Sequence, residues 1–179
     1  MKIIAFAATS STRSINKKLV IYAASLVPNA QVEVLDLNDY ELPLYSEDVE
    51  RELLARSGSP KIAKDFRSKL NQADALVVSF AEHNGTYTAA YKNLFDWCTR
   101  QGRDVYANKP LLVLSASKGP RGAITVLTQA VDSLPRFSAD VRASVSVPSF
   151  AENYDDETKT ITHSEINAKL KDAVLALIS

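Results

Sequence analysis

Five apolar runs alternate with helical patterns along this chain, and that alternation constrains the fold more than any other feature. The runs that predict strands cover 2–8, 31–37, 73–81, 109–117 and 140–148. Apolar residues at three- and four-residue spacing predict amphipathic helices over 14–28, 60–72, 86–101, 124–134 and 162–177. Parallel strands need helical crossovers, so the pattern predicts a parallel sheet with helices on both faces.

The composition of each run predicts the position of its strand in the sheet. The runs that begin at 2, 73 and 109 are continuously apolar, whereas those at 31 and 140 alternate with polar residues. Continuously apolar strands belong in the middle of a covered sheet and alternating ones at its edges. The predicted order is therefore 2-1-3-4-5, that of an α/β flavodoxin-like, doubly wound three-layer sandwich. Residues 38–58 are polar and irregular, and no linker divides residues 1–179, which we expect to form one domain.

Composition narrows the classes of function. The 179 residues include 21 Lys and Arg and 21 Asp and Glu, so the chain has no formal net charge. A general nucleic-acid binder needs a basic excess, and a membrane span needs about 20 consecutive apolar residues; the sequence shows neither. One cysteine, Cys98, excludes an internal disulfide and indicates a reducing compartment, while two distant histidines offer no metal cluster. We therefore expect a cytoplasmic protein without nucleic-acid, membrane or metal binding.

Three polar loops follow the strands predicted at the centre of the sheet, and a parallel sheet brings these loops to one edge. The loop at 8–16, ATSSTRSIN, leads into a helix and combines hydroxyl groups with one arginine and no carboxylate. The free N–H groups and positive dipole end of a helix N-terminus, joined by such donors, suit a phosphate dianion. The simpler interpretation, in which Ser14 caps the helix and the rest is a polar turn, is equally open at this point.

The other two loops suit a flat ligand. In AEHNGTYT, residues 81–88, Asn84-Gly85 predicts a tight turn whose backbone can pair with the edge of a ring. In SASKGPRGA, residues 115–123, glycines on both sides of a proline allow a ring close to the backbone. The chain lacks a G-x-S-x-G nucleophile elbow, a P-loop lysine and a G-x-G-x-x-G dinucleotide fingerprint.

These loops also follow the motifs of one enzyme family, G-S-x-R-x-x-S-x-N, P-E-Y-N-G-S-x-P-x-x-L-K-N-x-I-D-W and S-P-G-G-R-G-G. ATSSTRSIN matches the first, with Ala8 in place of glycine, Ser11 at the arginine position and Arg13 two residues later. The second motif matches residues 81–97, AEHNGTYTAAYKNLFDW, and this is the most specific of the three matches. The third motif matches SKGPRGA, with Lys118 in place of proline. Over essentially its whole length the chain resembles the NADPH-dependent FMN reductases, flavodoxin-like enzymes that include quinone, azo-dye and chromate reductases.

The resemblance implies an FMN cofactor, NAD(P)H as co-substrate, and hydride transfer to a quinone, free flavin or a similar acceptor. It implies that Thr9, Ser14 and Asn16 hold the phosphate and that residues 81–85 line the isoalloxazine ring. The residues implied around the cofactor come from all three loops: Thr9, Ser11, Arg13, Ser14, Ile15, Asn16, Ala81, Glu82, His83, Asn84, Gly85, Ser117, Lys118 and Gly119.

Three of these side chains carry hypotheses of their own. Arg13 is the candidate counter-charge of the phosphate. Lys118 is a candidate cation beside the reduced ring, where it would stabilise the negative charge near N1, or else a solvated lysine that points outward. His83 is either a solvated loop residue or a proton donor to the acceptor.

The family resemblance implies a homodimer or homotetramer, with Tyr91, Trp97 and residues 38–58 as candidate interface residues. Two other classes of function stay open. One is a flavodoxin-like FMN-binding electron carrier without NAD(P)H activity. The other is an interaction protein that has lost the flavin, which the departures at Ala8 and Ser11 keep open.

Overall fold

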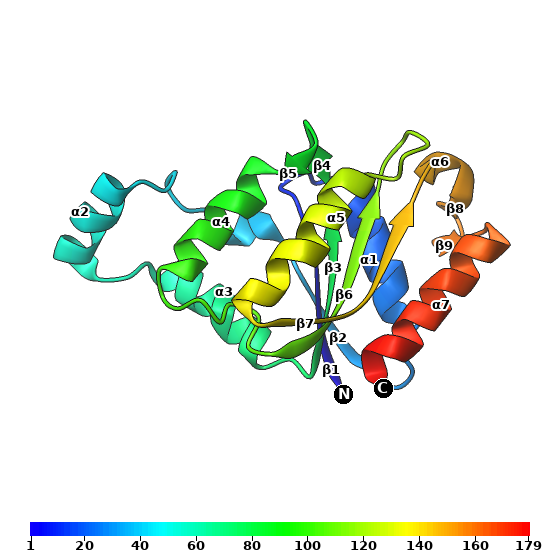
Figure 1. The fold of residues 1–179 in the computed structure, drawn as a ribbon, viewed down its shortest axis with the longest axis horizontal. Coiled ribbons are helices and arrows are strands. Elements are labelled where there is room, and N and C mark those ends of the chain that lie inside the picture. The colour runs from blue at the N-terminus through cyan, green and yellow to red at the C-terminus, as the bar shows by residue number, and fades with distance from the viewer.

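Five strands form one parallel sheet in the order β2-β1-β3-β6-β7, which confirms the predicted order (Figure 1). The computed structural model describes residues 1–179. The strands of this sheet are β1 (Lys2–Ala8), β2 (Gln31–Leu35), β3 (Ala75–Phe80), β6 (Lys109–Ala116) and β7 (Ala139–Val147). Every residue of the central strand β3 is buried, whereas only Leu35 is buried in the edge strand β2. Burial therefore follows the composition of the apolar runs.

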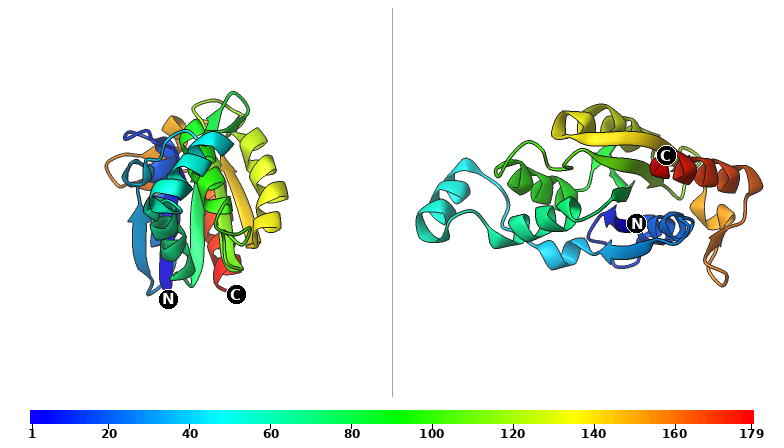
Figure 2. Two further views of the ribbon diagram at one scale, coloured as in Figure 1. Left: turned by 90° about the vertical axis from the view of Figure 1, so that its left-hand side faces the viewer. Right: turned by 90° about the horizontal axis from the view of Figure 1, so that it is seen from below.

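Helices cover both faces of the sheet and divide the core into two layers. On one face, α1 (Ile15–Ser25) and α7 (Ser164–Ile178) pack against apolar side chains of β1, β3, β6 and β7. On the other face lie α3 (Lys61–Asn71), α4 (Ala89–Thr99) and α5 (Ile124–Ser133). Both termini lie at the end of the molecule opposite the β6–α5 loop (Figure 2). The three polar loops follow β1, β3 and β6, which are parallel neighbours, so they meet at the edge of the sheet where these strands end. None of the helices is long and apolar enough to cross a membrane.

Residues 38–58 contain regular structure that the sequence did not predict. The segment begins with the end of a 3-10 helix, η1 (Leu37–Tyr40), and then forms α2 (Glu47–Ser57), which extends away from the sheet (Figure 1). The hydroxyl of Ser46 caps α2 by accepting the N–H of Val49 at 3.2 Å. No residue of α2 is fully buried, and only Val49 and Leu53 of the helix pack against the core, so its apolar stripe is too short for a periodicity analysis to find.

The second loop is a hairpin, and the helix after it begins later than expected. Strands β4 (Glu82–His83) and β5 (Thr86–Tyr87) pair antiparallel around Asn84 and Gly85. Both turn residues have positive φ, 53° and 79°, as a two-residue type I′ turn requires. The tight turn is confirmed. The predicted helix start at residue 86 is wrong, because the hairpin takes residues 86–87 and Thr88 caps α4 instead.

Short elements fill the remaining connections. A 3-10 helix, η2 (Leu134–Phe137), joins α5 to β7. Between β7 and α7 the chain forms α6 (Phe150–Asn153) and a second hairpin of β8 (Tyr154–Asp155) and β9 (Thr160–Ile161). The turn into α6 lies against the β6–α5 loop, because Ser149 N–H donates to the carbonyl of Gly119 at 2.9 Å.

Two aromatic residues expected at a subunit interface belong to the core instead. Tyr91 and Trp97 on α4 are 2% and 1% exposed. The hydroxyl of Tyr91 lies 2.7 Å from that of Tyr106, and the indole N–H of Trp97 donates to the carbonyl of Pro43 at 2.8 Å. Their assignment to an interface is wrong, because neither side chain reaches the surface of the chain.

Candidate functional site

A cavity of ≈ 350 Å³ opens where the carboxyl ends of β1, β3 and β6 meet. Small-molecule sites have volumes of about 300–1,000 Å³, so its size suits a ligand. All three loops contribute to its lining: Thr9, Ser11, Arg13, Ser14, Ile15, Asn16, Ala81, Glu82, His83, Ala116, Ser117 and Lys118. Asn84, Gly85 and Gly119, which the resemblance also implied, lie outside this lining. The structure therefore brings most of the expected site residues together around one space.

The wall formed by the β1–α1 loop presents unused backbone donors. The hydroxyl of Ser14 accepts the N–H groups of Asn16 and Lys17 at 3.1 and 3.4 Å and so caps α1. The N–H groups of Thr12, Arg13 and Ile15 have no acceptor within the chain. Ser14 is therefore a helix cap, as the simpler interpretation predicts. The N–H groups that remain free at the positive end of the helix, two of them on residues that line the cavity, suit an anion, and the phosphate interpretation stays a prediction.

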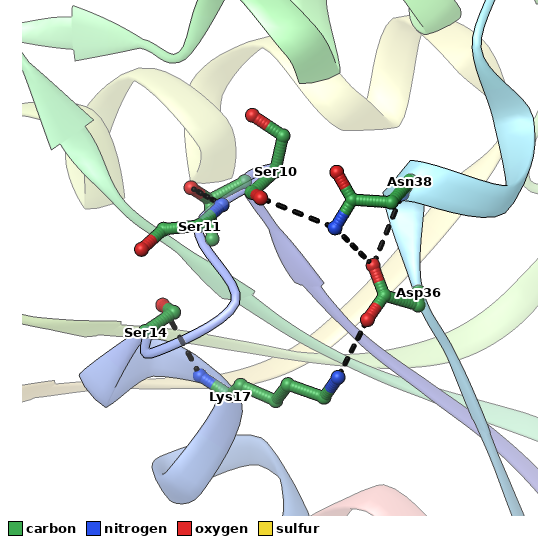
Figure 3. Close-up of polar contacts among 7 residues, drawn as sticks. Ser10, Ser11, Ser14, Lys17, Asp36 and Asn38 are labelled. Atoms are coloured by element: carbon green, nitrogen blue, oxygen red, sulfur yellow. Dashed lines mark hydrogen bonds and ion pairs between the residues drawn. The ribbon is translucent and has the colours of Figure 1, made fainter.

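A polar network holds the outer side of this loop (Figure 3). The amide of Asn38 donates to the carbonyl of Ser10 at 3.1 Å and to the carboxylate of Asp36 at 2.7 Å. The same carboxylate pairs with Lys17 at 2.6 Å, and this hydrogen bond lowers the pKa of Asp36. Lys17 is therefore occupied by Asp36. Asp36 and Asn38 were missed in the sequence because they follow β2, outside the three loops.

The side chain of Asn16 joins three segments of the fold. Its Oδ1 accepts the hydroxyl of Ser79 at 2.7 Å and the N–H of Ala116 at 2.9 Å, and its Nδ2 donates to the carbonyl of Ala116 at 3.3 Å. Both lone pairs of Oδ1 are thus used. Nδ2 keeps a second N–H, so the implied role of this side chain as a phosphate ligand stays a prediction. The contacts that the structure shows join the start of α1 to the ends of β3 and β6.

Side-chain hydrogen bonds fix the β4–β5 hairpin and the start of α4 to their neighbours. The carboxylate of Glu82 accepts the N–H of Val126 at 2.9 Å and so ties the hairpin to the first turn of α5. The hydroxyl of Thr88 donates to the carbonyl of Ala8 at 2.9 Å and fixes the start of α4 to the end of β1. His83 lies exposed on the hairpin at the edge of the cavity. Glu82 is therefore a carboxylate that the fold already uses.

The β6–α5 loop is held by the turn that follows β7. Phe150 N–H donates to the carbonyl of Ser117 at 3.0 Å, and Ser149 N–H donates to the carbonyl of Gly119 at 2.9 Å. In a trans peptide the N–H points opposite to the carbonyl, so the N–H of Lys118 points away from Phe150. This N–H has no acceptor within the chain. The loop thus combines a fixed backbone with a free donor.

The charges in this cavity favour an anion. Its charged side chains are the cations Arg13 and Lys118 and the single carboxylate of Glu82, so positive charge prevails. Neither Arg13 nor Lys118 takes part in an ion pair. A larger cavity of ≈ 470 Å³ between η1 and α4 contains Glu41 and no cation. The three-loop cavity is therefore the better phosphate site despite its smaller volume.

Cys98 is not part of a reactive centre. Its thiol is buried in α4, and burial raises its pKa to about 12. A thiolate is the reactive form of cysteine, so this residue is inert at neutral pH.

Comparison with solved structures shows the same fold. A flavoenzyme NAD(P)H:(acceptor) oxidoreductase of Paracoccus denitrificans aligns over 99% of this chain and 94% of its own, with a TM-score of 0.76 at 23% identity. An FMN-dependent NADH-azoreductase of Bacillus anthracis, solved with FMN, aligns over all of both chains with a TM-score of 0.66 at 13% identity. At these identities the likeness concerns the fold.

Sequence comparison identifies the family. The chain is 30% identical over 123 residues to an NAD(P)H-dependent FMN reductase of Pseudomonas aeruginosa, and 32% identical over 111 residues to a 2-hydroxy-1,4-benzoquinone reductase of a Burkholderia species. The matches cover 68% and 61% of this chain and 63% and 56% of the relatives, less than two thirds of either relative's length. The family model for NADPH-dependent FMN reductase matches residues 1–152. The chain belongs to the NADPH-dependent FMN reductase family.

Proposed function

We propose that the chain binds FMN in the three-loop cavity and uses it to pass hydride from NAD(P)H to a quinone, free flavin or a similar acceptor. The observation that carries the proposal is the pair of free N–H groups at Arg13 and Ile15 in the lining of the cavity, beside an unpaired arginine and in a loop that contains no carboxylate. Family membership and the names of the relatives support the same activity.

The residues around the cavity suit the two parts of FMN. The phosphate would be held by the free donors of the β1–α1 loop, the hydroxyl of Ser11 and the guanidinium of Arg13. The ring would lie between the β4–β5 hairpin and the β6–α5 loop, where the N–H of Lys118 is free. Bound FMN supplies the hydride-transfer chemistry, and the protein binds and orients it. The exposed imidazole of His83 is the candidate proton donor to the acceptor.

A comparison of FMN with riboflavin tests this proposal. Riboflavin lacks the phosphate, and each hydrogen bond to a charged group contributes about 1.5–3 kcal/mol. Two such bonds correspond to roughly 100-fold or more in affinity, so we expect riboflavin to bind at least about 100-fold more weakly. Arg13→Gln should weaken FMN binding about tenfold and leave riboflavin binding unchanged. Quenching of flavin fluorescence during titration of the apoprotein measures both.

Arg136→Gln is the matched control, because Arg136 is also exposed and unpaired but lies in η2, at the far end of β7. It should leave both affinities unchanged. Equal binding of FMN and riboflavin by the wild type would contradict the phosphate site. The enzymatic part has its own test: steady NADPH oxidation with a quinone such as menadione supports a reductase, and flavin binding without it supports the electron carrier instead.

We infer that the chain acts as a homodimer or homotetramer in a reducing, cytoplasmic compartment. The single buried thiol supports the compartment. The α2 arm, residues 44–57, supports the assembly, because Leu44 and Leu54 are 80% and 51% exposed. The first turn of α2 is acidic and Arg56 lies in its last turn, so two antiparallel copies of the helix have complementary charges. The arm is the part of the expected interface that reaches the surface.

Replacing both exposed leucines of the arm should weaken this assembly. We expect the assembly of the Leu44→Ser/Leu54→Ser variant to have a dissociation constant at least about tenfold larger than that of the wild type. The reason is that burying one leucine contributes about 1.5–3 kcal/mol. Sedimentation velocity across a dilution series measures the change. Leu175→Ser on α7, where the side chain is 59% exposed, is the control and should behave as the wild type. A monomeric wild type would contradict the assembly.

A further inference from the structure

Lys118 is the one cation that the β6–α5 loop contributes to the lining of the three-loop cavity. We propose that its ammonium group makes the site bind reduced FMN more tightly than oxidised FMN and thereby raises the reduction potential of the bound cofactor. The inference rests on the proposed function, because it requires the flavin ring to lie against this loop. The family motif has proline at this position, so the lysine is a feature of this chain and not of the motif.

The backbone places Lys118 firmly at the wall of the cavity. The carbonyls on either side of it, those of Ser117 and Gly119, accept hydrogen bonds from the N–H groups of Phe150 and Ser149. The hydroxyl of Ser117 also donates to the carbonyl of Gly119 at 3.0 Å. A loop fixed at both neighbouring carbonyls holds the Cα of Lys118 in one place, so only the side chain is free to move.

The charges around the cavity leave the ammonium group of Lys118 without a counter-ion. Glu82 is the one carboxylate in the lining; it keeps its charge, its Oε2 accepts the N–H of Val126, and it forms no ion pair with Lys118. Lys118 takes part in no ion pair and no side-chain hydrogen bond within the chain. Arg13 is the other cation, and it lies among the free donors that suit the phosphate. The two cations therefore belong to different loops, one at the phosphate wall and one at the ring wall.

Reduction changes the charge that this wall faces. Reduced FMN would carry one more negative charge on its ring than oxidised FMN, because a hydride brings two electrons and only one proton. The oxidised ring is neutral. A nearby cation therefore stabilises the reduced ring and has little effect on the oxidised one. Because the ammonium group is exposed, the gain is screened by water and salt, and a moderate effect is expected.

The affinities of the two redox states give the test. We expect Lys118→Gln to weaken the binding of reduced FMN about tenfold under anaerobic conditions and to leave the binding of oxidised FMN within about twofold. A tenfold change corresponds to a potential lower by ~30 mV for a two-electron couple. Lys118→Arg, which keeps the charge, should retain the wild-type ratio, and the difference between the variants should shrink as the salt concentration rises.

Lys64→Gln is the matched control, because Lys64 is an exposed, unpaired lysine on α3, far from the loops. An unchanged ratio in Lys118→Gln, with normal binding of oxidised FMN, would overturn this inference and leave the proposed function intact. Equal weakening of both redox states would also overturn it and assign Lys118 to the phosphate. A wild-type protein that binds no oxidised FMN would overturn the proposed function and this inference together.

Discussion

Replacing Gly122 with alanine is expected to lower the free energy of unfolding by about 3 kcal/mol. Gly122 has a φ of 59°, and a residue with a Cβ pays about 1–2 kcal/mol in this left-handed region. The added Cβ would also lie 2.1 Å from the hydroxyl oxygen of Ser146 and 3.0 Å from the backbone nitrogen of Pro148. Overpacking of this kind costs about 1–3 kcal/mol. The backbone atoms of the neighbouring strand cannot move aside as a flexible side chain would.

The carbonyl of Gly122 gives the position a second function. It accepts the hydroxyls of Ser115 and Ser146 at 2.7 and 2.9 Å, which joins the start of α5 to β6 and β7. Displacement of this residue would strain both hydrogen bonds and move the β6–α5 loop. We therefore expect a lower affinity for FMN in the same variant. Urea unfolding of the apoprotein and flavin titration measure the two effects separately.

Gly119→Ala is the matched control in the same loop. A Cβ at Gly119 would meet no atom within 4 Å, and its φ lies outside the left-handed region. Its effect on stability should be less than about 1 kcal/mol, since such a change mainly restricts the unfolded chain. Similar stabilities for Gly122→Ala and Gly119→Ala would show that the close approach of Gly122 to β7 has little energetic weight.

The second large effect is expected at Asn16. Alanine at this position would leave the hydroxyl of Ser79 and the N–H and carbonyl of Ala116 without partners. Ser79 is fully buried and Ala116 is 3% exposed, so the groups left without partners are buried, and the cavity that Asn16 lines gives water only limited access to them. Each buried unsatisfied group costs about 1–3 kcal/mol, and we expect a loss of about 3–4 kcal/mol in the free energy of unfolding. Affinity for FMN should fall as well, because the β1–α1 loop loses its attachment.

A double-mutant cycle with Ser79→Ala separates this network from the general effects of a substitution. Ser79→Ala removes the donor that Asn16→Ala leaves unpaired. The loss in unfolding free energy of the double variant should therefore be smaller than the sum of the two single losses by about 1 kcal/mol. Asn71→Ala, at an exposed position at the end of α3, is the control and should change stability by less than about 0.5 kcal/mol. Strict additivity at Asn16 and Ser79 would contradict the network.

The strands and their order follow from the sequence because burial and composition are directly linked. A strand covered on both faces is almost wholly apolar, so the run at 73–81 predicted a central strand, and β3 occupies Ala75–Phe80 within it. Its one polar side chain, Ser79, is buried and bonds to Asn16. The α2 helix, in contrast, cannot be recognised from its composition. Its stability depends on Ser46, on the acidic first turn and on a few contacts of one face, and none of these produces a long apolar stripe.

The composition of the site could be predicted, whereas the role of each side chain could not. The three loops were identifiable because the topology requires the carboxyl ends of parallel strands to meet. Asn16 lies in the expected loop, but whether its amide faces a ligand or the ends of β3 and β6 depends on residues that lie 63 and 100 positions away. Asp36 and Asn38 belong to a different connection and have no distinguishing sequence pattern. Trp97 was misplaced because an aromatic residue on a helix suits a core and an interface equally.

The long-range hydrogen bonds around the cavity have a consequence for folding during synthesis. Asn16 bonds to Ala116 and Thr88 to Ala8, across 100 and 80 positions of the chain. A polypeptide still emerging from the ribosome contains the β1–α1 loop early, but the three-loop cavity cannot form until β6 has been synthesised and has joined the sheet. FMN present in the cell would therefore bind only chains that have passed this stage, and its mass action would draw late folding intermediates toward the finished state.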